Sequence, residues 1–421
     1  MPPAETATRL SRRLGLGDAV GIGVGAMLGA GAFAAPGPAA ALAGSGVLLA
    51  LLLAGIVAYA NATSTARLAA TQPQAGGVYA FGRRRIGNTT GFIAGWAFVA
   101  GKLSSLIAMA LTFGAYALPS SPRAAGAAAV VVVTALNISG VQRTAKVATI
   151  GGIAVAMVLA TIGGGELLSA GSGDHGFDRL TPLSGNGGLH GILGAAAIMF
   201  FAFAGYARIA TLGEEVRNPA TTIPRAVPIA LVIVFATYLV SLTGALVAIG
   251  PEAIAASPAP LEEAARHGLG SAAGGAIRLA AAAASLGVLL SLLAGVARTA
   301  FAMAADGELP KILASVSART KVPHSAQTAA GGIVLLGVMF APTASAIATS
   351  SLLILTYYAI AHLSALRLSS GERRPVLLAP AGLIGCAALA TNLPGSDLIT
   401  GVAILAFGLA ARAFSRAIRR G

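Results

Sequence analysis

The sequence predicts an all-helical integral membrane protein with about 12 transmembrane helices. Only 10% of the 421 residues are charged and 56% are hydrophobic, and the mean hydropathy is +0.82. Apolar stretches of about twenty residues, the length that a helix needs to cross the hydrocarbon core, recur along nearly the whole chain. This composition excludes a disordered chain and argues against an ordinary soluble fold.

Twelve apolar ranges, bounded by charges, prolines or turn residues, are each expected to form a helix, because a helix satisfies its own backbone in lipid. The ranges are 17 to 43, 47 to 68, 89 to 118, 124 to 139, 146 to 169, 190 to 213, 225 to 250, 271 to 304, 325 to 341, 344 to 366, 375 to 393 and 396 to 417. No soluble domain interrupts the series. We therefore expect one transmembrane domain over residues 1 to 421.

The basic residues predict how these helices are oriented. With a cytoplasmic amino terminus, 22 of the 28 Lys and Arg residues fall on the cytoplasmic side, as the positive-inside rule requires. Two lie within helices, Lys102 and Arg208. Four lie outside, namely Arg123, Arg179, Arg266 and Arg278. We therefore expect a multi-pass protein of the plasma membrane. Both of its termini should lie in the cytoplasm.

The net charge of +14 raises the question of a nucleic-acid partner. The basic residues, however, occupy the gaps between apolar runs, as at residues 83 to 85, and form no stripe interleaved with aromatic residues. No nucleic-acid partner is expected. The basic residues of the carboxyl-terminal tail are expected to touch anionic lipid headgroups. They are Arg412, Arg416, Arg419 and Arg420.

Nothing in the sequence indicates a metal site, a cofactor or catalytic residues. The single cysteine, Cys386, excludes a disulfide framework. The five histidines lack ligand spacing, and hydrolase, zinc-protease and phosphate-loop motifs do not occur. A membrane-embedded enzyme would need titratable groups that converge in the bundle, whereas only Lys102, Arg208 and Glu166 lie at depth.

Two predicted helices contain segments that should unwind. Residues 21 to 33 include five glycines, each about 1 kcal/mol less favourable in a helix than alanine. Residues 203 to 206 form a weaker break five helices later. Unwound backbone at bilayer depth must be satisfied by protein or by a wet cavity, so these segments are candidates for lining a site. The glycines of residues 21 to 33 could instead allow close packing between helices. They also match a loose dinucleotide-binding fingerprint, but residues 41 to 60 lack the acid that this fingerprint requires.

Four stretches carry a family pattern. They are residues 23 to 33, residues 73 to 79 with 91 to 96, residues 203 to 226, and residues 298 to 310. In this order and spacing the chain resembles the amino acid–polyamine–organocation superfamily of transporters, particularly the cationic amino acid transporters and their bacterial relatives. The resemblance implies two five-helix inverted repeats of LeuT type, residues 14 to 169 and 190 to 367, and two accessory helices within 375 to 417. It also implies alternating access around discontinuous helices 1 and 6, with an amino acid as substrate.

The resemblance also implies a substrate site at the two unwound segments. Amides around Gly29, Ala30 and Gly31 would receive the substrate carboxylate. Carbonyls near Phe203, Ala204 and Gly205 would receive its amino group. A zwitterion needs donors at one end and acceptors at the other, which agrees with this arrangement. The remaining candidate substrate-binding residues are Gly25, Met27 and Tyr206.

The charge pattern departs from that of the cationic branch. Transporters of that branch usually have an acid directly after the aromatic residue of the second break, where this chain has Ala207 followed by Arg208. A neutral amino acid is therefore favoured, and an anionic one remains open. The alternatives are a cationic amino acid or polyamine carrier, an amino acid exporter, a passive channel and, more distantly, a membrane-embedded enzyme.

Lys102 and Ser291 are candidates for coupling transport to an ion or proton. Lys102 falls about 16 Å along its helix, near the bilayer centre, where a lysine costs on the order of 2.5 to 3.5 kcal/mol. It could be a titrating amine that couples transport to protons, or a structural lysine bonded to carbonyls. Ser291 could approach the first break, or it could bond the backbone of its own helix. Proton coupling and exchange are both open.

Overall fold

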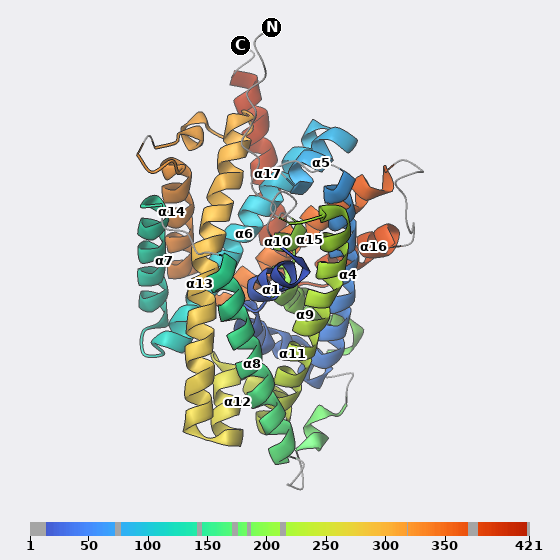
Figure 1. The fold of residues 1–421 in the computed structure, drawn as a ribbon, viewed down its shortest axis with the longest axis vertical. Coiled ribbons are helices and arrows are strands. Elements are labelled where there is room, and N and C mark those ends of the chain that lie inside the picture. The colour runs from blue at the N-terminus through green and yellow to red at the C-terminus, as the bar shows by residue number, and fades with distance from the viewer. Residues whose placement is uncertain are drawn as a thin grey trace.

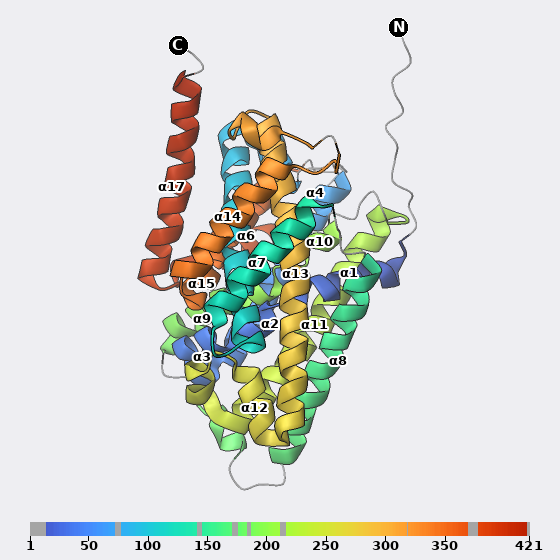
Figure 2. The same ribbon diagram turned by 90° about the vertical axis from the view of Figure 1, so that its left-hand side faces the viewer.

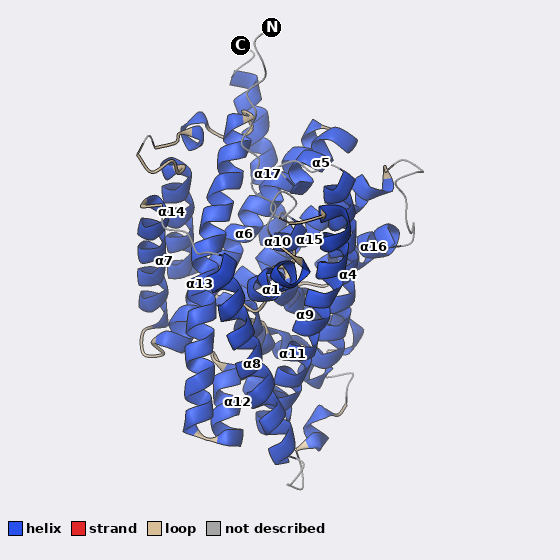
Figure 3. Cartoon of the chain, in the orientation of Figure 1, coloured by secondary structure: helices blue, strands red, loops and turns tan. Residues whose placement is uncertain are grey.

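A computed structural model describes residues 14–71, 77–140, 145–170, 176–182, 187–210, 216–317, 319–368 and 378–418. Within these ranges the regular secondary structure is helical, joined by loops and turns, and no strand occurs, only one isolated β-bridge (Figure 3). The bridge joins Leu14 to Val216, and the Arg217 amide donates to the Leu14 carbonyl at 2.8 Å. It ties the segment before the first helix to the segment before α11 (Pro219–Ala256).

The chain begins with α1 (Leu16–Met27), α2 (Gly31–Ala34), α3 (Pro36–Ala43), the 3-10 turn η1 (Gly44–Gly46) and α4 (Val47–Thr71). It continues with α5 (Gly77–Arg85), α6 (Asn88–Ala117), α7 (Pro122–Ile138), α8 (Ala145–Ala170), η2 (Phe177–Leu180), α9 (Gly188–Phe203) and α10 (Ala207–Ala210). After α11 come α12 (Pro260–Leu269), α13 (Ser271–Ala305), η3 (Lys311–Ala314), α14 (His324–Phe340), α15 (Thr343–Leu366), α16 (Leu378–Thr391) and α17 (Gly395–Ile418).

The predicted all-helical fold is confirmed for the described residues, in which each predicted range contains helix and the first and sixth ranges are divided among shorter helices. Within the described ranges, nine segments are long and apolar enough to cross a membrane, and α7, α14 and α16 are shorter apolar helices. The sequence analysis missed α5 and α12. Both are short and carry charges, which an analysis of apolar runs passes over. Helix α12 starts with Pro260 and has Glu262 and Glu263 in its first turn, where both residue types favour a helix start.

The long helices run mostly along one axis of the bundle (Figures 1 and 2). Helix α5, the start of α14 and the end of α17 gather at one end, while α12 and the end of α8 lie at the other. Helix α1 crosses the middle of the bundle at a steep angle to that axis, since it is seen nearly end-on in Figure 1 and from the side in Figure 2. This placement brings the end of α1 to the centre of the molecule.

Candidate functional site at the two helix breaks

The first break separates α1 from α2. Helix α1 ends at Met27, and Leu28 leaves the helical region with φ −77° and ψ 50°. The Gly29 amide turns back onto the Met27 carbonyl at 2.8 Å. Within the described chain no backbone acceptor is found for the amides of Ala30 and Gly31, the first two of the new half-helix. The predicted unwinding of this helix is therefore confirmed, and it leaves donors free at the break.

The second break separates α9 from α10. Helix α9 ends at Phe203, and Ala204 leaves the helical region with φ −62° and ψ 2°. The Phe203 carbonyl accepts the Tyr206 amide at 3.2 Å, and the Gly205 carbonyl accepts the Arg208 amide at 3.0 Å. Two of the three predicted acceptor carbonyls thus already take part in the local turn, although each oxygen keeps a second lone pair.

The two breaks pack directly against each other. A Cβ on Gly205 would lie 2.2 Å from the Ala26 carbonyl oxygen, and one on Gly31 would lie 2.6 Å from the Ala202 Cα. Both distances are too short for any side chain. Glycine at these two positions is therefore required by the approach of one broken backbone to the other.

Lys102 contacts the second break from α6. Its side chain is 7% exposed, and its ammonium donates to the Ala204 carbonyl at 3.3 Å. This is the carbonyl-bonded arrangement that the sequence left as one of two alternatives. The side chain of Arg208 is exposed, whereas that of Lys102 is buried against the unwound backbone.

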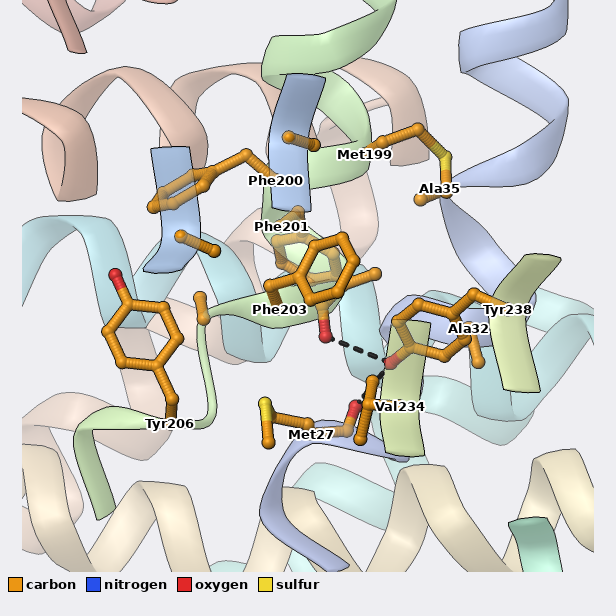
Figure 4. Close-up of a cluster of buried hydrophobic side chains, with 14 of the residues drawn as sticks. Met27, Ala32, Ala35, Met199, Phe200, Phe201, Phe203, Tyr206, Val234 and Tyr238 are labelled. Carbon is orange, nitrogen blue, oxygen red and sulfur yellow. Dashed lines mark hydrogen bonds between the residues drawn. The ribbon is translucent and has the colours of Figure 1, made fainter. Parts of the chain in front are cut away.

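Buried apolar and aromatic side chains surround the breaks (Figure 4). Met27, Phe203 and Tyr206 are each at most 2% exposed. The Tyr206 ring lies 5.3 Å from that of Tyr358 on α15, and the Phe203 ring lies edge-to-face with Tyr238 at 5.3 Å. These three candidate substrate-binding residues therefore lie in one buried region, which is lined by hydrocarbon and aromatic surface.

Tyr238 on α11 was missed by the sequence analysis. Its hydroxyl lies 2.7 Å from the Met27 carbonyl oxygen and 3.0 Å from that of Ala202 (Figure 4). One side chain therefore bridges the ends of α1 and α9. No local motif marks Tyr238, because it is one aromatic residue in a long apolar helix, and only the packing of α11 against the breaks reveals its partners.

Two predicted site residues have other contacts. Gly25 faces α8, where a Cβ would lie 2.3 Å from the Ala148 carbonyl oxygen, so close helix packing explains the glycine. The structure shows for Ser291 the other alternative, a bond to the backbone of its own helix. Its exposed side chain bonds carbonyls of its own helix at 3.2 Å, and Val288 from the previous turn lies against Gly29 instead.

The prediction that Arg412 touches lipid headgroups is wrong. Its guanidinium is buried and donates to both Glu308 carboxylate oxygens, at 2.6 and 2.8 Å. It also lies over the Phe92 ring at 4.7 Å. Arg416, which is partly exposed, donates to the same carboxylate at 3.2 Å. Arg419 and Arg420 lie outside the described residues. The basic tail therefore attaches α17 to the loop after α13.

A helical membrane bundle in which two broken helices meet at the centre is typical of membrane transporters, which bind their substrate between such helices. The amino acid permease family model matches residues 18–371, and the chain belongs to this family. The expected superfamily resemblance is thereby confirmed. The protein is an amino acid transporter and not an enzyme.

Relatives agree with this assignment. An uncharacterized transporter of Mycobacterium tuberculosis is 47% identical over 421 residues, which is 100% of this chain and 95% of that protein. The vacuolar cationic amino acid transporter 2 of Arabidopsis thaliana is 30% identical over 75% of this chain and 55% of its own length. The branched-chain amino acid permease BcaP of Bacillus subtilis is 24% identical over 68% of this chain and 65% of its own length.

Proposed function

We propose that this protein is a secondary permease that carries neutral amino acids across the plasma membrane by alternating access, driven by protons or by exchange. Its core would be two inverted five-helix repeats, residues 14 to 169 and 190 to 367, followed by two accessory helices within 375 to 417. Twelve membrane crossings would place both termini in the cytoplasm. The net direction of flow follows the gradients, so export is included in the proposal.

The observation that carries the proposal is the meeting of the two breaks. The amides of Ala30 and Gly31 start a half-helix at one side, and half-helix starts favour a carboxylate. The carbonyls at the ends of α1 and α9 lie close by, which suits an amino group. Met27 and Phe203 supply an apolar wall for the substrate side chain.

The charges near the second break favour a neutral substrate. Position 207 is alanine, and the ammonium of Lys102 contacts the Ala204 carbonyl. A second cation at this depth would be repelled by that ammonium, because little water screens the pair. Relatives carry both kinds of name, cationic amino acid transporter and branched-chain amino acid permease. The rival function is therefore a cationic amino acid or polyamine carrier.

Lys102 is the proposed coupling residue. It is buried, it is held by a backbone carbonyl, and among the described residues it has no acidic partner. A buried lysine can lose its proton when its surroundings change, since its charge costs free energy there. Release of that proton would turn a charge-assisted hydrogen bond to Ala204 into a weaker neutral one and loosen the second break, which links protonation to the site.

Counterflow in liposomes tests the function. Purified protein would be loaded with unlabelled and supplied with labelled L-leucine, L-alanine, L-arginine or putrescine, under an imposed proton or sodium gradient. Accumulation of L-leucine or L-alanine above protein-free liposomes supports the proposal. Accumulation of only L-arginine or putrescine would establish the rival carrier, and no accumulation of any of the four would refute transport of these classes.

A further inference from the structure

The hydroxyl of Tyr238 occupies a point where two helix ends converge. Met27 is the last residue of α1, and Ala202 lies one residue before the end of α9. The last carbonyls of a helix have no intrahelical donor and carry the negative end of the helix dipole. Tyr238 places a neutral O–H between two such carbonyls, at 2.7 and 3.0 Å.

This pair of acceptors is better suited to an ammonium than to a phenol. A single O–H proton must be shared between the two carbonyls, whereas an ammonium offers three donors and a full positive charge. Charge-assisted hydrogen bonds are roughly twice as strong as neutral ones. The acceptors at Met27 and Ala202 are therefore only partly satisfied by the side chain that now holds them.

Lys102 makes the Ala204 carbonyl a poor acceptor for the substrate ammonium. The Ala204 oxygen already accepts an ammonium at 3.3 Å. A substrate ammonium at the same oxygen would meet a like charge in a buried setting, which is unfavourable. The two carbonyls held by Tyr238 face no cation among the contacts of the described chain, and they lie side by side at one hydroxyl, so together they suit a positively charged group.

We propose that the Tyr238 hydroxyl is a built-in competitor of the substrate: in the empty carrier it occupies the carbonyl site of the amino group, and it leaves when an amino acid binds. The inference rests on the proposed function. Phe203 packs edge-to-face on the Tyr238 ring at 5.3 Å, so displacement of the phenol also shifts the contact between α11 and the end of α9. Tyr238 is thereby a residue that sets affinity and transmits occupancy of the site to α11.

The competition predicts that removal of the Tyr238 hydroxyl strengthens substrate binding, whereas loss of a hydrogen-bonding group in a binding site usually weakens it. Tyr238→Phe removes the hydroxyl, so that the Ala202 carbonyl and the second lone pair of the Met27 carbonyl, which also accepts the Gly29 amide, become available to the substrate. The Kd for L-leucine, measured by scintillation proximity on purified protein, should fall about fivefold, the equivalent of one neutral hydrogen bond. The Kd for 4-methylpentanoate, which lacks the amino group, should stay unchanged. Tyr59→Phe, at an exposed tyrosine of α4, is the matched control and should alter neither value.

Unchanged or weaker L-leucine binding by a folded Tyr238→Phe protein would overturn the inference, because a merely structural hydroxyl would give that result. A second measurement avoids dependence on the folding of the variant. With 3-fluorotyrosine at position 238, saturating L-leucine should shift the fluorine NMR signal, whereas the label at position 59 should not respond. Absence of a shift at position 238 would equally overturn it.

The outcomes separate this inference from the proposed function. Wild-type protein that binds L-leucine but fails both tests refutes only the role of Tyr238. Wild-type protein that binds and transports neither L-leucine nor L-alanine refutes the neutral amino acid permease, and the competitor role of Tyr238 falls with it.

Discussion

The ammonium nitrogen of Lys102 lies 3.3 Å from the carbonyl oxygen of Ala204, the residue at which α9 stops being a helix. The contact joins two features that lie 102 residues apart in the chain. It gives an otherwise costly buried cation a partner, and it gives an orphan carbonyl a donor. Protonation of one side chain is thereby connected to the geometry of the second break.

Lys102→Met should separate coupling from folding. The variant removes a buried charge and keeps the apolar stem, which offsets the loss of the donor to the Ala204 carbonyl, so its melting temperature in detergent should change little. If Lys102 couples transport to protons, uptake into liposomes should lose its response to an imposed proton gradient. Lys146→Met, at an exposed position of α8, should keep the response. A Lys102→Met protein with full proton-driven uptake would rule out the coupling role.

Gly205→Ala should abolish transport. The new Cβ would fall 2.2 Å from the Ala26 carbonyl oxygen, so the two breaks would have to separate. Overpacking of this kind costs roughly 1–3 kcal/mol, enough to lower the melting temperature by several degrees. Gly295→Ala on α13, where no atom lies within 4 Å of the added methyl, is the control and should be neutral in both assays. Equal activity of the two variants would mean that the breaks do not need this approach.

Glu308→Gln should destabilise the attachment of α17. Removing the carboxylate leaves the Arg412 guanidinium buried without its ion pair, a loss of roughly 1.5–3 kcal/mol for hydrogen bonds to a charged group. Thermal unfolding followed by size-exclusion chromatography would measure it. Glu263→Gln, at an exposed glutamate of α12, is the control. A stability of Glu308→Gln equal to that of the control would show that the ion pair contributes nothing.

The same ion pair predicts a pH dependence. Burial raises the pKa of the Glu308 carboxyl, but the hydrogen bonds and charge of Arg412, with the charge of Arg416, outweigh burial and lower it overall. A lowered folded-state pKa means that the contribution is present above the ordinary glutamate pKa of about 4.3 and is lost as pH falls through the folded value. The stability gap between wild type and Glu308→Gln should therefore close in acid. A gap that widened in acid would contradict this sign.

Cysteine labelling tests the orientation. Cys386 is buried and is the only cysteine, so Cys386→Ala provides a cysteine-free background. A membrane-impermeant maleimide should label Glu263→Cys on intact cells, because α12 lies on the predicted outer side. Lys311→Cys, exposed at the opposite end, should be labelled only after lysis. The reverse pattern would invert the predicted topology.

Sequence alone determined where the helices are and where two of them break. Apolar length fixed the spans, because a helix in lipid must satisfy its own backbone along a length set by the bilayer. The glycines before and after Met27 lowered the cost of unwinding, so the first break could be predicted within residues 21 to 33. Helices α5 and α12 were not predicted, because short helices that carry charges lack a long apolar run.

Only the tertiary structure decided which side chains and carbonyls pair with one another. Tyr238 became a partner of Met27 and Ala202, and Arg412 a partner of Glu308 at a separation of 104 residues, without any local sequence mark. Such pairings depend on which faces of distant helices come together. Composition and spacing along one chain do not specify that choice, whereas close packing of the bundle does.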